Sequence, residues 1–480
     1  MNIVDVIRGE TSNYLDKSAI IDGNNQISYA ELFAAIDGLA AELKACGIRP
    51  AQRVALLCGD SIDYIVINLA VLSISAVIVP VFPSSSRDEI DTIIEKMSIN
   101  YLISERPIHF QDNTKQILFN YTGKKEFFLY HRLLGEQISA EYYTINPAFI
   151  RFSSGTTGIN KGVVLSHESI IQRTDAANKG LKITSEDIII WILSMTFHFV
   201  VTIFLFLRRA ATIVLCSSEF PQALINGLKR YKATFIYASP FHYYMLSRTD
   251  TFSPDLLSGV RIAVSTATNL PNDNAGDFYE KFGFELSQAY GIIEVGLPFI
   301  NCSADKTNRG SVGRILPDYE IKIVNPDAEG IGEIRLRGKG MFSAYFQPWQ
   351  SRDKFSGDGW FSTGDLGRLD KDDYLFLVGR TNSLINYCGM KIFPYEVEAV
   401  LNQHPAIKES LVFGIPHPQY GQLPGAKIIL EDTTEEKFDS NDLRKFCYQH
   451  LASYKVPKEF YTVSCLAKTT SGKLKRGSSF

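Results

Sequence analysis

The sequence lacks three features that would assign it to a specialised class of protein. Its 49 Lys and Arg and 52 Asp and Glu leave a formal net charge of −3, which supplies no basic field for nucleic acid or anionic lipid. Its seven cysteines are odd in number and form no CxxC pair, which disfavours a disulfide framework and a zinc site and favours a reducing compartment. The N-terminal MNIVDVIRGE carries acidic residues and no uninterrupted apolar core, unlike a signal peptide. We therefore expect a cytoplasmic protein without a nucleic-acid partner.

Long hydrophobic runs are also scarce, with one stretch that imitates a membrane span. The segment 188–207, IIIWILSMTFHFVVTIFLFL, has the length of a transmembrane helix and no Asp, Glu, Lys or Arg. Its start is rich in β-branched residues, and Ser194, Thr196, His198 and Thr202 interrupt it. We interpret it as a buried strand leading into a helix, and we expect no membrane span.

The pattern along the first part of the chain alternates helices with short apolar strands. A helix is expected at 29–46, and strands are expected at 53–57, 76–81, 211–215, 235–238 and 260–264. Such alternation predicts an α/β fold with parallel-rich sheets wrapped by helices. With 480 residues, the chain is too long for one compact core, so two or more domains are expected.

The later part of the chain changes character. The strands IKIV and GEIRLRG, separated by NPDAEGIG, predict a hairpin in a small β subdomain at about 310–338. After Arg380 come an expected helix at 394–402, strands near 409–413 and 426–430, and a helix at 441–451. We expect a large N-terminal domain at 1–380 and a small, mobile α+β C-terminal domain at 381–480.

The segment 152–167, FSSGTTGINKGVVLSH, has the composition of a phosphate-binding loop. Gly155, Gly158 and Gly162 lack Cβ atoms, so backbone N–H groups can turn inward. Side-chain donors and a positive charge come from Ser153, Ser154, Thr156, Thr157 and Lys161. A Walker motif is excluded, because Lys161 is followed by Gly162 rather than Ser or Thr. A solvated Gly/Ser/Thr surface turn is the alternative for this segment taken alone.

Four further blocks accompany this loop: YGIIEVG at 290–296, STGDL at 362–366, GRTNSLINYCGMKIFPYEVE at 379–398 and KTTSGKLKR at 468–476. The five blocks together resemble, in order and spacing, those of the adenylate-forming superfamily. That superfamily includes acyl- and aryl-CoA ligases, adenylation domains of peptide synthetases, and luciferases. The resemblance covers essentially the whole chain and implies ATP-dependent activation of a carboxylic acid to acyl-AMP, with release of pyrophosphate.

The resemblance also implies roles for individual residues. Thr156, Thr157 and Lys161 would hold the β- and γ-phosphates, within a loop that includes Ser153, Ser154, Gly155 and Gly158. Glu294 would help to coordinate Mg²⁺, Tyr290 would pack on adenine, Asp365 would accept hydrogen bonds from the ribose, and Arg380 would contact ribose or phosphate. Lys473 matches the late catalytic lysine, and Asn382 stands at the family's hinge, which is usually Asp or Lys. One departure is Ile293, where the family carries a threonine.

The substrate pocket is expected to be apolar. Amino-acid-activating relatives carry an aspartate after a phenylalanine in the pocket segment, whereas this chain reads Phe197-His198-Phe199 and has no acid from 193 to 202. An α-ammonium group would be left unpaired there, so we expect an aryl or aliphatic acid rather than an α-amino acid. The expected lining is Phe197, Phe199, Ala267, Ala289, Gly291 and Leu297. His198 either orients the substrate carboxylate or is a core histidine with its hydrogen bonds satisfied.

The sequence ends at Phe480, shortly after Lys473, so we expect the acceptor thiol to arrive separately. It would belong to coenzyme A or to the phosphopantetheine of a freestanding acyl carrier protein. Two alternatives remain open: a luciferase-like oxygenase that uses the same adenylate, and a non-catalytic nucleotide-binding regulator. The presence of both Lys473 and Glu294 disfavours the regulator.

Overall fold

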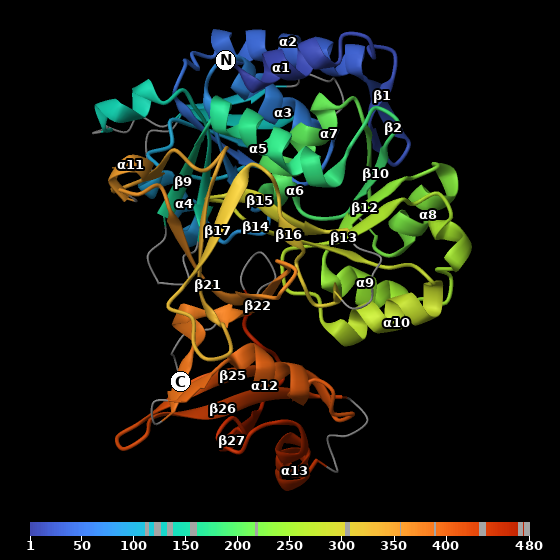
Figure 1. The fold of residues 1–480 in the computed structure, drawn as a ribbon. Helices are drawn as coiled ribbons and strands as arrows, with labels where there is room; N and C mark the ends of the chain where they lie inside the picture. The colour runs from blue at the N-terminus through green and yellow to red at the C-terminus, as the bar shows by residue number, and fades with distance from the viewer. Residues whose placement is uncertain are drawn as a thin grey trace. The chain divides into compact units, whose positions relative to one another are not determined.

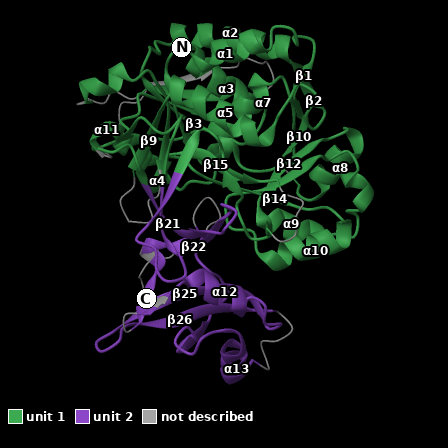
Figure 2. Cartoon of the chain, viewed as in Figure 1, with its two compact units in different colours: residues 1–155, 159–320, 336–361 green, residues 156–158, 321–335, 362–480 purple. Residues whose placement is uncertain are grey.

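The computed structural model describes residues 1–110, 115–119, 126–131, 138–153, 161–216, 219–302, 308–355, 357–387, 390–431, 438–468 and 474. These residues form two compact units (Figure 2). Unit 1 contains the described residues of 1–153, 161–320 and 336–361, and unit 2 contains 321–335 and the described residues from 362 onward. The domain boundary after Arg380 stays a prediction.

Unit 1 contains two nine-stranded sheets. The first has a parallel centre, β11-β10-β12-β13-β14, extended by parallel β1 and by antiparallel strands at both edges. In spatial order its strands are β16 (Arg314–Ile315), β15 (Gly296–Asn301), β14 (Ser287–Ile292), β13 (Ile262–Ser265), β12 (Phe235–Ala238), β10 (Ile188–Trp191), β11 (Thr212–Leu215), β1 (Ser18–Asp22) and β2 (Asn25–Ser28).

The second sheet is parallel only at its centre, where β8, β4, β3 and β5 run side by side. In spatial order its strands are β20 (Gln350–Ser351), β19 (Ala344–Phe346), β9 (Lys161–Ser166), β8 (Pro147–Ser153), β4 (Val77–Val81), β3 (Arg53–Leu57), β5 (Tyr101–Ser104), β7 (Phe127–His131) and β6 (Lys115–Phe119). The antiparallel pair β8 and β9 places Ser153 opposite Lys161, at the two ends of the glycine-rich segment.

Helices separate and cover the two sheets (Figure 1). Two of them, α3 and α5, each contact strands of both sheets and therefore lie between them. Below the first sheet, α8, α9 and α10 pack on β10, β11, β12 and β13 in one apolar core. The helices of unit 1 are α1 (Ile3–Glu10), α2 (Tyr29–Ala45), α3 (Ile62–Ser73), α4 (Arg87–Lys96), α5 (His167–Leu181), α6 (Met195–His198), α7 (Phe204–Arg208), α8 (Gln222–Arg230), α9 (Pro240–Ser247), α10 (Asn272–Phe282) and α11 (Arg352–Phe355).

Local sequence explains where these helices begin and which faces they bury. Helix α2 starts with a capping box, in which the Ser28 hydroxyl accepts from the backbone of Glu31 and the Glu31 carboxylate accepts from the backbone of Ser28. Helix α3 is apolar on every side, and all nine residues from Tyr64 to Leu72 are buried. A helix without a polar face is stable only where neighbours surround it, which is the case between the two sheets.

The apolar segment 188–207 is part of this core. It forms β10, α6, a π-helical turn at Phe199–Ile203, and α7, so the predicted strand leading into helix is confirmed. Phe204, Leu205, Phe206 and Leu207 are all fully buried. Among the helices in the described part of the chain, none is long and apolar enough to cross a bilayer.

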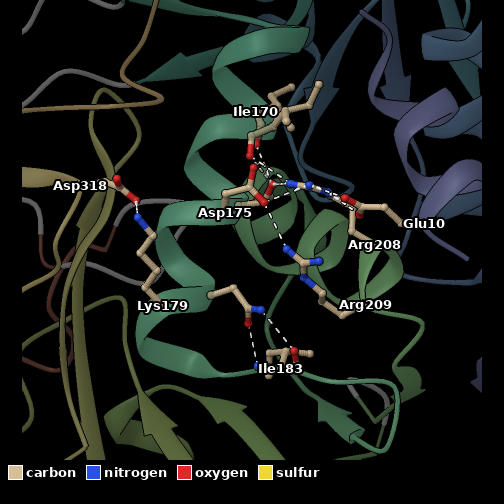
Figure 3. Close-up of polar contacts among 11 residues, drawn as sticks. Glu10, Ile170, Asp175, Lys179, Ile183, Arg208, Arg209 and Asp318 are labelled. Atoms are coloured by element: carbon tan, nitrogen blue, oxygen red, sulfur yellow. Dashed lines mark hydrogen bonds and ion pairs between the residues drawn. The ribbon is translucent and has the colours of Figure 1, made fainter.

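Ion pairs and hydrogen bonds fix the position of α5 (Figure 3). The buried Arg208 guanidinium bonds Glu10 at 2.7 Å, the carbonyl oxygen of Ile171 at 3.0 Å and Asp175 at 3.0 Å. Near the other end of the helix, the Lys179 ammonium pairs with Asp318. The helix is therefore tied to α7, through Arg208 to α1, and to Asp318 near its other end.

Unit 2 combines a small sheet region with an α+β part. Strands β17 (Tyr319–Val324) and β18 (Gly332–Gly338), which begin or end in unit 1, form a four-stranded sheet with β21 (Phe361–Leu369) and β22 (Leu375–Arg380), in the order β17-β18-β21-β22. The expected hairpin of IKIV and GEIRLRG is thus present. A second sheet has the order β24-β23-β26-β25, with β27 paired to β26.

In the α+β part, both expected helices are present within one residue of their predicted bounds, and both expected strands are present but longer than predicted. Its elements are β23 (Ile385–Tyr387), β24 (Met390–Ile392), α12 (Pro394–Leu401), β25 (Ile407–His417), β26 (Gly421–Leu430), α13 (Ser440–His450) and β27 (Glu459–Thr462). One apolar core joins the two helices to the sheet and includes Val397, Leu401, Ile428, Leu443 and Cys447. Asn382, the expected hinge residue, belongs to a 3₁₀ turn at Thr381–Ser383, and its side chain lies outside the described part.

Candidate functional site

The glycine-rich segment connects the end of β8 to the start of β9. Ser154, Gly155, Thr156, Thr157 and Gly158 lie outside the described residues, as does the side chain of Ser153, so their predicted phosphate contacts stay predictions. Gly162 is a strand residue of β9 rather than part of the loop. A Cβ atom there would lie 2.5 Å from the Met97 sulfur, so close packing favours glycine at this position, and its expected contribution to a phosphate cradle stays a prediction.

Lys161 is held on an aromatic ring at the start of β9. Its ammonium nitrogen lies 4.6 Å from the centroid of the Tyr345 ring, and the lysine is partly buried. Tyr345 comes from β19, which pairs with β9 and places Tyr345 opposite Val163. The two strands therefore carry the lysine and its aromatic support side by side.

Glu294 lies in the tight turn between β14 and β15. Its backbone carbonyl accepts a hydrogen bond of 2.7 Å from the Phe342 amide, and its Oε1 accepts one of 3.4 Å from the Tyr345 hydroxyl. Burial and the Glu294 charge raise the pKa of Tyr345, so its phenol stays protonated and acts as the donor. Glu294 itself is partly exposed. Its carboxylate is thus oriented from one side and reachable by solvent.

Arg173 of α5 holds the turn that contains Glu294. Its Nη1 donates to the Ile293 carbonyl at 3.1 Å, while its Nε and Nη2 donate to the Gly340 carbonyl at 2.9 and 2.6 Å. The side chain is fully buried, and burial lowers its pKa to about 10, which leaves it charged at neutral pH. Gly340 has φ +70°, and a Cβ atom there would lie 2.4 Å from the backbone nitrogen of Arg173. Only glycine therefore fits this close approach.

The segment around His198 contains the expected pocket aromatics. The Phe197 ring lies 5.4 Å from the Phe82 ring and is partly buried. Phe199 is fully buried, with its ring 5.6 Å from Tyr64 and 4.9 Å from Phe204, which places it in the core around α3. His198 ends α6 and is partly buried. The lining roles of these three residues stay predictions.

The other expected pocket residues lie just after β13, within β14 and at the start of β15. Ala289 and Leu297 are buried, Gly291 is exposed and Ala267 is partly exposed. The Thr266 hydroxyl donates to the Ala289 carbonyl at 3.4 Å, which joins the end of β13 to β14. A Cβ on Gly291 would lie 3.0 Å from the Leu297 side chain, so these two residues are immediate neighbours. Tyr290 is largely buried, with its ring 6.1 Å from Phe299.

In unit 2, Asp365 and Arg380 stand opposite each other on β21 and β22. The Arg380 Nε donates to Asp365 Oδ1 at 2.7 Å, and the Thr363 hydroxyl accepts from the Asp365 backbone at 3.0 Å. The two residues expected to contact ribose and phosphate are therefore partners in one ion pair. Lys473, the expected catalytic lysine of the same unit, lies outside the described residues.

The structure adds a cation that the sequence analysis did not select. Arg151 of β8 donates from Nη1 to the Phe197 carbonyl at 2.9 Å, and its guanidinium lies 5.3 Å from the Phe197 ring centroid. Burial lowers its pKa to about 10, and the nearby Glu294 opposes this shift. The sequence could have indicated Arg151, because it is a charged residue within the apolar strand PAFIRFS. The sequence gives no comparable indication for Tyr345 or Arg173, because their contacts come from distant segments.

Comparison with known proteins identifies the family. A family model described as AMP-binding enzyme matches residues 8–346, and one described as AMP-binding enzyme C-terminal domain matches residues 396–473. The chain belongs to the AMP-binding enzyme family. The adenylate-forming resemblance seen in the sequence is therefore confirmed.

Relatives of this AMP-binding enzyme match it along nearly its whole length. It is 27% identical to 4-coumarate–CoA ligase 1 of Oryza sativa subsp. japonica, over 96% of this chain and 88% of the relative. The structure of ATP-bound MatB from Rhodopseudomonas palustris superposes with a TM-score of 0.84 at 23% identity, covering 99% and 97% of the two chains. O-succinylbenzoate CoA synthetase from Bacillus subtilis, with its acyl-adenylate intermediate, gives 0.84 at 24% identity, covering 98% and 96%. These likenesses confirm the predicted α/β fold.

A second unexpected group in the AMP-binding enzyme is Asp60, in the loop between β3 and α3. Its Oδ1 accepts from the Met195 amide at 2.9 Å. A carboxyl group therefore lies at the start of the pocket segment 193–202, which contains no acidic residue of its own. Burial raises the pKa of Asp60 to about 7, and the Met195 hydrogen bond only partly opposes this shift. Asp60 is therefore protonated in a large fraction of molecules at neutral pH.

This raised pKa predicts a pH-dependent stability. The folded protein holds the Asp60 proton more tightly than the unfolded chain, whose aspartate pKa is about 4, so Asp60 makes folding less favourable as pH rises from about 4 to about 7. Asp60→Asn keeps the acceptor for Met195 and removes the charge. We expect its melting temperature to exceed that of wild type by roughly 2–4 °C at pH 8 and to approach it at pH 5.

Thermal unfolding at pH 5, 6, 7 and 8 measures this difference. Asp63→Asn, in the first turn of the adjacent α3, is the matched control and should show no such trend. A constant difference between Asp60→Asn and wild type across the pH range would contradict the assignment.

Proposed function

We propose that this AMP-binding enzyme activates an aryl or aliphatic carboxylic acid with ATP and then transfers the acyl group to a thiol. A carboxylate oxygen attacks the α-phosphorus, and the bond from that phosphorus to the bridging oxygen breaks, which releases pyrophosphate and leaves acyl-AMP. The acceptor thiolate then attacks the acyl carbon and expels AMP. The names of the curated relatives, which include 4-coumarate–CoA ligases, favour coenzyme A as the acceptor; the thiol of a freestanding acyl carrier protein is the alternative.

The observation that carries this proposal is the convergence of Lys161 and Glu294 on Tyr345. The main barrier is electrostatic, because an anion must approach a polyanion, and the reaction requires cations and metal-binding carboxylates at the triphosphate. Lys161 adjoins the glycine-rich segment and supplies such a cation. Arg151, bonded to the Phe197 carbonyl, adds a second positive charge beside the proposed acid pocket. His198, next to Phe197, stays a candidate to orient the carboxylate.

Glu294 fits a role as a magnesium ligand. Within the described ranges, no group of three or more His, Cys, Asp or Glu side chains could hold a metal by itself. Magnesium in nucleotide sites commonly uses one or two carboxylates and completes its shell with phosphate oxygens and water, so a single, partly exposed carboxylate is sufficient. When bound, Mg²⁺ would neutralise part of the triphosphate charge.

The experiment that tests the proposal is pyrophosphate release across a panel of aryl, fatty and amino acids. Mass analysis of coenzyme A and carrier-protein products would then identify the acceptor. We expect release with aryl or fatty acids and a thioester of the same acid. If no acid in the panel causes pyrophosphate release, the proposal is overturned in favour of a nucleotide-binding regulator. Oxygen uptake or light emission would favour the oxygenase.

Asp365 provides a prediction for the nucleotide part of the site. Asp365→Asn keeps the side-chain shape but removes the charge expected to accept from ribose and paired with Arg380. Losing a charge-assisted hydrogen bond corresponds to about a 10–100-fold rise in KM for ATP, with a smaller change in kcat. Steady-state kinetics of pyrophosphate release measures both constants.

The exposed Asp372, in the turn that joins the same two strands, supplies the matched control Asp372→Asn. If Asp365→Asn lowers the melting temperature and leaves KM for ATP unchanged, then Asp365 serves only to hold Arg380.

A further inference from the structure

Tyr345 contacts both Lys161 and Glu294. Its ring supports the lysine ammonium at 4.6 Å, and its hydroxyl donates to Glu294 Oε1 at 3.4 Å. The face of an aromatic ring attracts cations, and a phenol hydroxyl donates to carboxylates. One tyrosine can therefore contact the ammonium with its ring and the carboxylate with its hydroxyl.

The surrounding backbone fixes the tyrosine in this place. Tyr345 pairs with Val163, and Lys161 lies two residues from Val163 on the same strand face, which makes it a diagonal neighbour of the tyrosine. The Phe342 ring packs 4.8 Å from the Tyr345 ring, while the Phe342 amide bonds the Glu294 carbonyl at 2.7 Å. The segment from Phe342 to Tyr345 therefore holds both the backbone and the carboxylate of Glu294.

Tyr345 therefore contacts both charged side chains with a neutral one. Its ring faces the Lys161 ammonium, and its hydroxyl donates to the Glu294 carboxylate.

We propose that Tyr345 is a positioning residue that presents Lys161 to the nucleotide phosphates through its ring and Glu294 to the metal through its hydroxyl. This inference rests on the proposed function and extends it by assigning two roles to one side chain. The ring would contribute to ATP affinity both with and without metal. The hydroxyl would contribute only to the increase in ATP affinity that the metal causes.

Two substitutions separate these roles. Tyr345→Phe retains the ring and removes the hydroxyl, whereas Tyr345→Leu removes both. Isothermal calorimetry of ATP binding, once with EDTA and once with Mg²⁺, measures the two affinities without any turnover. Tyr14→Leu, at an exposed tyrosine of unit 1, is the control for loss of a tyrosine elsewhere.

For Tyr345→Phe we expect metal-free ATP binding within about twofold of wild type and binding with Mg²⁺ weaker by about tenfold, the low end for partners of metal ligands. For Tyr345→Leu we expect metal-free binding weaker by about tenfold, consistent with loss of a partly desolvated cation–π contact. Melting curves establish that each variant is folded.

The inference is overturned if Tyr345→Phe changes neither affinity or changes both equally, or if folded Tyr345→Leu binds metal-free ATP as wild type does. Tyr345→Phe decides the hydroxyl role even if the leucine variant does not fold. A wild-type enzyme that binds ATP but releases no pyrophosphate with any acid would contradict the proposed function, while the calorimetry would still decide the role of Tyr345.

Discussion

Lys473→Ala is expected to lower the rate of adenylate formation by at least about 100-fold, the equivalent of one charge-assisted hydrogen bond of about 3 kcal/mol in the transition state. The reason is electrostatic: by the family resemblance, Lys473 bridges the substrate carboxylate and the α-phosphate as two anions approach. Neutralising that approach should add to the loss. Thioester formation from supplied acyl-adenylate needs no such bridge and should continue at nearly the wild-type rate.

Separate assays of the two half-reactions make this a sharp test. Pyrophosphate exchange reports adenylate formation, and conversion of synthetic acyl-AMP to acyl-CoA reports the second step. Lys475→Ala removes a neighbouring charge from the same basic segment and should leave both steps near wild type. Equal loss of both half-reactions in Lys473→Ala would refute the assignment.

The second large effect is expected for Glu294→Gln. The amide keeps the size of the side chain and an oxygen that can accept from Tyr345, but it loses the charge that attracts a divalent metal. Partners of metal ligands commonly contribute 10–100-fold, so replacing a ligand itself should lower kcat/KM for ATP by at least about 100-fold. Higher Mg²⁺ concentration should restore part of the activity.

The readout is pyrophosphate release as a function of Mg²⁺ concentration. Glu280→Gln, at an exposed position of α10, controls for loss of a surface carboxylate. A Glu294→Gln enzyme whose activity falls without any change in its magnesium dependence would show that Glu294 does not serve the metal.

Much of the fold could be predicted because short-range patterns dictate it. The helix expected at 29–46 is α2 at Tyr29–Ala45, and the strands expected at 53–57 and 235–238 have these bounds in the structure. Apolar periodicity and capping residues act within a few positions of each other, so the sequence displays them directly. The small α+β part after Arg380 was predictable for the same reason.

Pro80 shows how packing can override the usual preference of a residue. Proline rarely occurs inside a central strand, yet Pro80 lies inside β4 and pairs with Leu56 of β3, within the strand expected at 76–81. Gly162 also lies inside a strand, where a Cβ atom would come within 2.5 Å of the Met97 sulfur and 3.0 Å of an Ile150 methyl group.

The sequence by itself determined the family, through motif blocks whose residue types and order suit phosphate and nucleotide chemistry. It named Lys161 and Glu294 as members of one site, although it contained nothing to say what lies between them. Only the tertiary structure decided that Tyr345 contacts both, that Arg173 holds the Glu294 turn through the Ile293 carbonyl, and that Asp60 reaches the Met195 amide. The physical reason is that these contacts join segments far apart in the chain. Which side chains meet across such segments produces no periodic pattern in the sequence.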